Sequence, residues 1–76
     1  MNAELHDLLV TELRLTPDAV RDEARIEDAG LDSLTLVELS QLLGEKWDVQ
    51  VGEDALAANA TLGELDRMVA DRRARR

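Results

Sequence analysis

The leucines of this chain recur at helical spacing, and that pattern constrains the fold more than any other feature of the sequence. Three segments place apolar residues three and four positions apart, so that in a helix they share one face. Residues that favour strands are scarce, and a single tryptophan is the only aromatic residue. We therefore predict an all-α fold. The three stripes are Leu5, Leu8, Leu9 and Leu13; Leu36, Leu39, Leu43 and Trp47; and Leu62, Leu65, Met68 and Val69.

Local signals mark where the helices begin and end. Asn2 and Asp32 are positioned to cap the first and second helices. The first helix should end before Thr16-Pro17, because a residue that precedes proline is disfavoured in helical conformation, and one short turn can follow there. The segment Thr61–Glu64 matches a capping box that opens the last helix. With a short helix over residues 53–58, the sequence predicts a four-helix bundle of three main helices and one short one.

Between the first two main helices, residues 16–32 show no sustained hydrophobic period. Val20 and Ile26 are isolated apolar residues among charged neighbours. A loop of this length in so small a domain is usually functional or disordered. We expect this loop to be ordered, because these two side chains can enter the core. The stretch from Val49 to Gly52 is too short to predict a sheet.

The size and the charge of the chain exclude several classes of function. Its 76 residues leave room for one small domain, and a ligand pocket of about 300–1,000 Å³ would hollow out the core, so an enzyme is not expected. We assign residues 1–71 to the domain; their 5 basic and 17 acidic residues give a net charge of −12. Such a surface repels nucleic acid and anionic lipid and prefers partners with a basic surface. Residues 72–76 hold four arginines and are expected to form a solvated tail.

Residue types and segments that the chain lacks bear on its cellular setting. It has no cysteine, which excludes disulfides and thiolate–metal sites. No stretch approaches the roughly 18 apolar residues of a membrane-spanning helix, and no apolar leader follows the first residue. We therefore expect a soluble cytoplasmic protein that is complete from Met1 and monomeric when alone.

Calcium binding and nucleophilic catalysis are not expected either. A calcium loop that starts at Asp28 would place Gly30 at a ligand position and Leu39 where a glutamate is required, so no metal site is predicted. A serine hydrolase would need a base beside Ser33. His6 is the only histidine, and it falls on the polar side of the first helix.

The segment Gly30-Leu31-Asp32-Ser33-Leu34 places a hydroxyl at the start of the second helix, after the long loop. One interpretation is purely local, since aspartate and serine favour helix starts and glycine favours loops. The other is that Ser33 is an exposed attachment point, where the positive end of the helix dipole favours a phosphodiester. A second face of this helix carries apolar residues and acids outside the core stripe, which predicts a docking surface. This docking face comprises Leu34, Val37, Glu38, Gln41 and Glu45.

The same region resembles the signature of acyl carrier proteins. In that family the serine of Asp-Ser-Leu carries 4′-phosphopantetheine, so the resemblance implies Ser33 as the attachment residue and Asp32 as its motif neighbour. It further implies a right-handed four-helix bundle and the docking face as the partner surface. The implied partners are a phosphopantetheinyl transferase and a ketosynthase, acyltransferase or similar biosynthetic enzymes with basic docking surfaces. The resemblance is carried by Ile26-Glu27-Asp28-Ala29-Gly30-Leu31-Asp32-Ser33-Leu34-Thr35-Leu36-Val37-Glu38-Leu39 and continues through Trp47-Asp48, Val49-Gln50-Val51 and residues 61–69.

Several residues depart from the fatty-acid carriers of that family. Thr35 stands where those carriers often have a second aspartate, and Gly44 interrupts the second helix. Trp47, Gly52 and Asn59 stand where phenylalanine, proline and an apolar residue are usual. Together these departures favour a stand-alone carrier of the polyketide type.

Such a carrier holds acyl or polyketide intermediates as thioesters on the phosphopantetheine arm and passes them between enzymes. The resemblance implies that the growing chain lies between helices, against Leu39, Leu43, Val51 and Leu62. Two alternatives stay open. One is an aminoacyl or peptidyl carrier of a nonribosomal pathway, and the other is a helical interaction module that is never modified.

Overall fold

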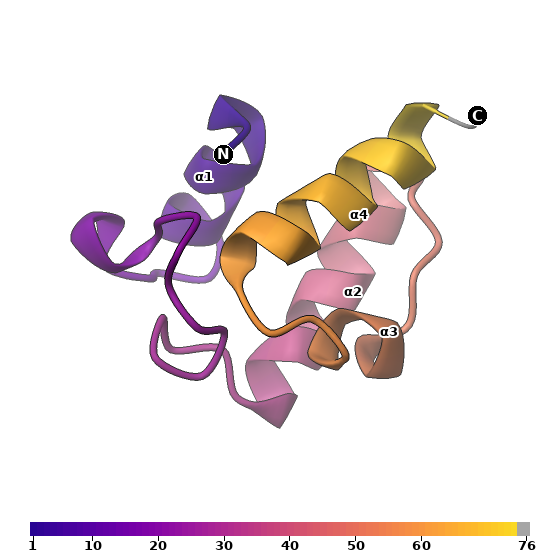
Figure 1. The fold of residues 1–76 in the computed structure, drawn as a ribbon. Helices are drawn as coiled ribbons and strands as arrows, with labels where there is room; N and C mark the ends of the chain where they lie inside the picture. Colours follow the sequence, from indigo (N-terminus) through magenta and orange to yellow (C-terminus); the bar gives the residue numbers. More distant parts are fainter. Residues whose placement is uncertain (75–76) are drawn as a thin grey trace.

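The computed structural model describes residues 1–74; the last two arginines lie outside the described part of the chain. The fold is all-helical, as predicted. Three main helices pack around one interior, and a short helix lies beside the lower part of α2 (Figure 1). The elements are α1 (Ala3–Thr11), the 3-10 turn η1 (Pro17–Ala19), α2 (Ser33–Trp47), α3 (Glu53–Ala57) and α4 (Leu62–Ala74).

The core is built from the predicted stripes and from segments between the helices. All stripe residues except Leu13, Trp47 and Met68 are buried, and these three are half-buried against the core. Val49 and Val51 add two more buried side chains from the extended connection after α2. Each fully buried side chain of this kind stabilises the fold by about 1.5–3 kcal/mol. Helix packing without disulfides is therefore the main source of stability.

The long loop before α2 is ordered, as expected, and packs against the start of α4. Val20 and Ile26 are 3% and 4% exposed. The backbone N–H of Ile26 donates to the carbonyl oxygen of Ala60 at 3.3 Å, and a single β-bridge joins Arg25 to Thr61. Ala29 and Leu31 are also buried, which the sequence pattern did not predict. The loop thus forms one wall of the core.

After two main helices the chain turns away at a residue with left-handed backbone rather than at a glycine. Arg14, just after α1, has φ 60°, and Asp48, at the end of α2, has φ 56°. In each case the next backbone N–H turns back onto the helix: Leu15 donates to the carbonyl oxygen of Leu9 at 3.2 Å, and the same arrangement closes α2. The prediction that Leu13 belongs to the first helix was wrong, because α1 ends at Thr11 with Glu12 as its C-cap, and Arg14 then turns the chain away.

The C-terminal arginines that the structure describes are not a free tail. The helix α4 continues through Ala74, three residues beyond the boundary that the sequence predicted. The guanidinium carbon of Arg73 lies 4.2 Å from the centroid of the Trp47 ring, and its Nη1 lies 3.4 Å from Glu4 Oε1. Arg72 Nη1 donates to the carbonyl oxygen of Gln50 at 3.1 Å. The core prediction for Trp47 needs correction as well, because its ring is half-buried and covered by this arginine.

Candidate functional site

The hydroxyl-bearing segment lies where the long loop passes into α2. Gly30 has φ 102°, a conformation that side chains disfavour, and the chain then extends into the Asp32 cap. Oδ1 of Asp32 accepts the backbone N–H of Thr35 at 2.8 Å, which confirms the predicted N-cap. Ser33 follows as the first residue of α2. The local sequence therefore determines both where α2 begins and that Ser33 is its first residue.

Ser33 itself is accessible. Its side chain is exposed, and within residues 1–74 no hydrogen bond engages its hydroxyl. The free backbone N–H groups and the dipole of a 15-residue helix favour negative charge at this end. A phosphate ester on this oxygen would extend into solvent beside a favourable helix end. The residue therefore fits the covalent attachment of a phosphate-bearing group.

Asp32 is held in its ionised form. The backbone N–H and the hydroxyl of Thr35 both donate to its carboxylate, each at 2.8 Å. These hydrogen bonds keep the pKa of the Asp32 carboxyl below its ordinary value of 3.8. A fixed negative charge thus lies directly beside Ser33.

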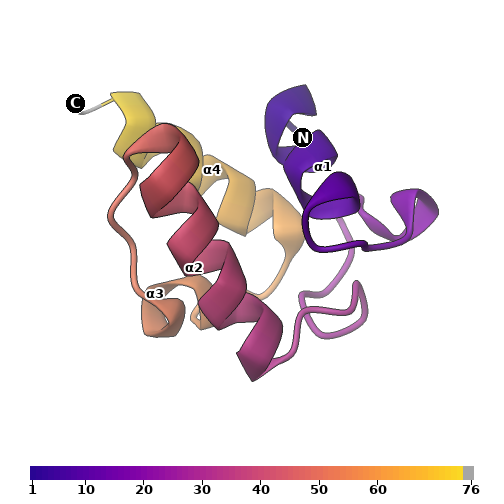
Figure 2. The ribbon, with the colours of Figure 1, turned by 180° about the vertical axis from the view of Figure 1, so that it is seen from behind.

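The predicted docking face lies along α2. Figure 2 shows this helix, which begins at its lower end in that view. Leu34 is the one large apolar residue that is exposed among residues 1–74, at 70%. The acids Glu38 and Glu45 are exposed as predicted, and so is Gln41.

Val37 was predicted to be open to solvent, but it is half-buried. Ser40, its neighbour one turn further on the same helix surface, is also half-buried. The Ser40 hydroxyl donates to the carbonyl oxygen of Val51 at 2.6 Å. Val37 therefore lies at the edge of the docking face, where the connection to α3 begins to cover the helix.

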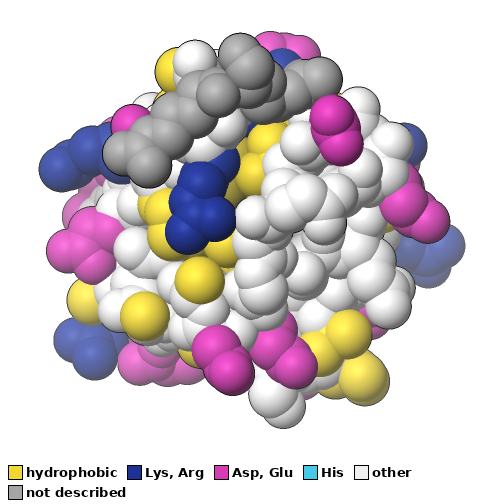
Figure 3. Space-filling model, turned by 90° about the vertical axis from the view of Figure 1, so that its right-hand side faces the viewer, with side chains coloured by type: hydrophobic (Ala, Val, Ile, Leu, Met, Phe, Trp, Pro, Cys, Tyr) yellow, Lys and Arg dark blue, Asp and Glu magenta, His cyan; other side chains and the backbone are white. Residues whose placement is uncertain are grey.

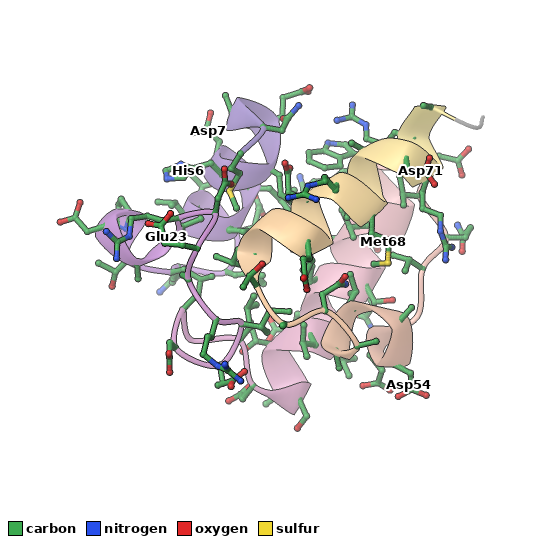
Figure 4. The ribbon with its side chains drawn as sticks, viewed as in Figure 1. His6, Asp7, Glu23, Asp54, Met68 and Asp71 are labelled. Carbon is green, nitrogen blue, oxygen red and sulfur yellow. The ribbon has the colours of Figure 1, made fainter. Side chains whose placement is uncertain are left out.

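Acidic side chains also surround the side of the molecule that carries α3, where Figure 3 shows them around a mixed polar and apolar surface. Asp54 on α3 points outward from this side (Figure 4). The acidic character predicted from composition is therefore not restricted to α2.

His6 does not approach Ser33. It lies on α1, at the opposite end of the molecule from the beginning of α2, with Asp7 beside it (Figure 4). His6 Nδ1 is 3.9 Å from the Asp7 carboxylate. No group of three histidine or acidic side chains within residues 1–74 is arranged to hold a metal ion.

The side chains that the resemblance assigns to the cargo, Leu39, Leu43, Val51 and Leu62, are at most 6% exposed. They meet inside the closed core. A cleft of about 320 Å³ opens elsewhere, between α1, α4 and the end of α2, and Trp47 and Arg73 line it. This cleft could not be predicted from the sequence pattern, because it depends on how the ends of three helices meet.

The chain is similar to a known protein family and to several curated proteins. Residues 3–69 match the protein family described as the phosphopantetheine attachment site. The chain is 34% identical to an acyl carrier protein of Sulfurovum sp. over 67 residues, 87% of this chain and 89% of that protein. The chain belongs to the acyl carrier protein family. An acyl carrier protein of Wolinella succinogenes is 31% identical over 67 residues, 87% of this chain and 88% of its own length. One of Campylobacter fetus is 47% identical over 49 residues, 63% of this chain and 64% of its own.

No solved structure was found to match the chain. The all-helical structure is consistent with the predicted bundle, and the family match identifies 4′-phosphopantetheine as the cofactor. The chain is a carrier rather than an enzyme. Its family implies interaction with a phosphopantetheinyl transferase and with biosynthetic enzymes. Among residues 1–74, no helix has both the length and the apolar character needed to cross a membrane.

Proposed function

We propose that Ser33 is the residue to which the phosphopantetheine arm is joined. The observation that carries the proposal is the exposed Ser33 hydroxyl, free of hydrogen bonds within residues 1–74, at the start of a capped helix. In the attachment step the Ser33 oxygen forms a bond to the phosphorus of the pantetheine phosphate of coenzyme A. The pyrophosphate bond breaks, adenosine bisphosphate leaves, and the hydroxyl proton passes to the transferase. The attached arm supplies a thiol that holds cargo as a thioester.

The test is incubation with coenzyme A and a broadly specific phosphopantetheinyl transferase, followed by intact-mass measurement. The wild-type protein should gain the mass of one phosphopantetheine, and Ser33→Ala should gain none. Ser40→Ala is the matched control, because Ser40 is the only other serine and is half-buried against Val51. It should load fully. Loading of Ser33→Ala would contradict the assignment of the site, and a wild-type protein that stays unmodified would contradict it and favour an interaction module.

The docking face is proposed as the surface that basic partner enzymes bind. Leu34 offers an exposed apolar contact, and Glu38 and Glu45 add negative charge further along the same helix. Complementary charge raises the association rate and selects partners, and salt screens it. Glu38→Lys combined with Glu45→Lys should slow loading several-fold at low salt and much less at high salt. Asp7→Lys, on α1, is the matched control and should leave the rate unchanged.

Within the carrier class, we propose a stand-alone carrier that passes polyketide-type intermediates between enzymes. Thr35, Trp47 and Asn59 support this subtype, because each departs from the residue usual in fatty-acid carriers. Isolation of the protein from its native host with cargo attached, and measurement of the cargo mass, tests the subtype. Polyketide intermediates are expected. An amino acid or peptide on the arm would instead identify a nonribosomal carrier.

The growing chain is proposed to enter between the helices, against Leu39, Leu43 and their neighbours. Because these side chains are sealed in the described structure, entry requires α2 and α3 to separate. The Ser40–Val51 hydrogen bond joins α2 to the segment that leads into α3. Amide hydrogen exchange in this region should therefore change when an acyl chain is attached, and identical exchange would contradict sequestration.

A further inference from the structure

The side chain of Thr35 is engaged with the residue that precedes the attachment serine. Its hydroxyl donates to Oδ1 of Asp32 at 2.8 Å, and its own backbone N–H donates to the same oxygen at 2.8 Å. Thr35 is half-buried in the first turn of α2, whereas Asp32 and Ser33 are exposed. One anchored residue therefore holds an exposed carboxylate through two donors.

Two donors on one oxygen restrict the carboxylate more than a helix cap requires. The backbone N–H alone satisfies the capping role, and any residue except proline at position 35 would supply it. The hydroxyl adds a second, charge-assisted bond that limits rotation of the Asp32 side chain. It also fixes the direction in which the negative charge faces, one residue from the reacting oxygen.

We infer that Thr35 is a positioning residue for phosphopantetheine attachment, because its hydroxyl fixes the Asp32 carboxylate in the orientation that the basic transferase binds. This inference rests on the proposed role of Ser33. Thr35 acts through Asp32 and does not itself contact the reacting atoms. A neutral hydroxyl at this position thus contributes to recognition by orienting the charge that precedes Ser33.

The first test is steady-state loading kinetics with a purified phosphopantetheinyl transferase and coenzyme A. Thr35→Val and Thr35→Ala both keep the backbone N–H and remove the hydroxyl. Each should raise the KM for the carrier by about threefold to tenfold, the range that one exposed hydrogen bond covers, with kcat unchanged. Thr35→Ser restores the hydroxyl and should restore the KM.

Thr11→Val is the matched control, because the Thr11 hydroxyl also bonds within its own helix, to the carbonyl oxygen of Asp7 at 2.6 Å. It should leave the KM at the wild-type value. An unchanged KM in Thr35→Val, a fall in kcat alone, or an equal effect in Thr11→Val would overturn the inference. If the wild-type protein is not loaded at all, the proposed function of Ser33 fails instead.

A second readout does not depend on loading. The pKa of the Asp32 carboxyl, followed by carbonyl NMR in the unmodified protein, should rise toward its ordinary value in Thr35→Val and Thr35→Ala, because one of the two hydrogen bonds to the carboxylate is removed. It should return to the wild-type value in Thr35→Ser. If the pKa of Asp32 stayed at the wild-type value in Thr35→Val and Thr35→Ala, the hydroxyl would not hold the carboxylate, and the inference would be rejected.

Discussion

Both α2 and α4 begin at a residue whose side chain caps the helix, but the two helix starts differ in whether another segment covers them. At α4, two backbone N–H groups donate to another part of the chain: Leu62 to the carbonyl oxygen of Ala24, and Gly63 to that of Asp22, both at 2.9 Å. The long loop therefore covers this helix end. Two of the N–H groups at the positive end of α4 are thereby engaged in hydrogen bonds within the fold.

At α2, the first turn is capped by the residue that precedes it rather than by another segment. Asp32 caps the helix through its own side chain, and within residues 1–74 no carbonyl from another segment accepts a hydrogen bond from the first turn. Leu34 extends outward from this turn. A helix start that is covered by the chain contributes to stability, whereas one that is capped locally stays accessible for the attachment that we propose at Ser33.

The largest expected effect comes from adding a side chain at the covered start of α4. A Cβ at position 63 would lie 3.0 Å from the carbonyl oxygen of Asp22, too close for ordinary contact. Gly63→Ala should therefore push the loop from α4 and lower the free energy of unfolding by about 1–3 kcal/mol. Urea denaturation measures this. A variant as stable as wild type would show that the loop does not seal α4.

The next effect concerns the capping box of α4. Thr61 Oγ1 accepts the backbone N–H of Glu64 at 3.3 Å, and Glu64 Oε1 accepts that of Ala60 at 2.7 Å. Thr61→Ala should lower the free energy of unfolding by about 1 kcal/mol and leave the loading rate unchanged. Asp32→Ala also removes a cap and should lower the free energy of unfolding by a similar amount, but unlike Thr61→Ala it should slow loading. If the two variants loaded at the same rate, the division between the two helix starts would not hold.

A smaller effect of opposite sign is expected inside α2. Gly44 is a helical glycine like Gly63, but a Cβ there would lie 3.6 Å from Gln50 Nε2 and 4.0 Å from the carbonyl oxygen of Val49, which is ordinary contact. Gly44→Ala should raise the free energy of unfolding by up to about 1 kcal/mol, since alanine favours the helix. Thermal unfolding of the two glycine variants, which should shift in opposite directions, is the measurement.

The smallest effect is the response of α2 to acid. The pKa of Asp32 is lowered in the folded protein, because Thr35 donates two hydrogen bonds to the ionised carboxylate. Its contribution to stability is therefore present above the unfolded-state pKa and is lost as the pH falls through the folded-state value. The stability difference between the wild-type protein and Asp32→Asn should shrink as the pH falls below about 4. A difference that grows on acidification would contradict the sign of this shift.

Local features of both helix starts could be predicted from the sequence, whereas their tertiary surroundings could not. The caps at Asn2, Asp32 and Thr61 were predicted because each depends on residues within one turn. The contacts of Gly63 with Asp22 join segments about 40 positions apart and left no periodic signal.

The site itself divides in the same way. Ser33, its cap and most of the docking face follow from a motif and a helical period. The second hydrogen bond of Thr35 does not, because a threonine in a helix can adopt more than one χ1 rotamer and its hydroxyl can bond to more than one acceptor. Similarly, the stacking of Arg73 on Trp47 depends on how far α4 extends, and charge alone indicated a tail.

That stacking gives the protein an internal optical probe. Trp47 is the only aromatic residue in the sequence, so all near-ultraviolet absorption and intrinsic fluorescence of the polypeptide arise at one indole beneath one guanidinium group. It is the last residue of α2, whereas Ser33 is the first. Emission at this ring therefore reports, without any label, whether an event at one end of the helix is transmitted to the other.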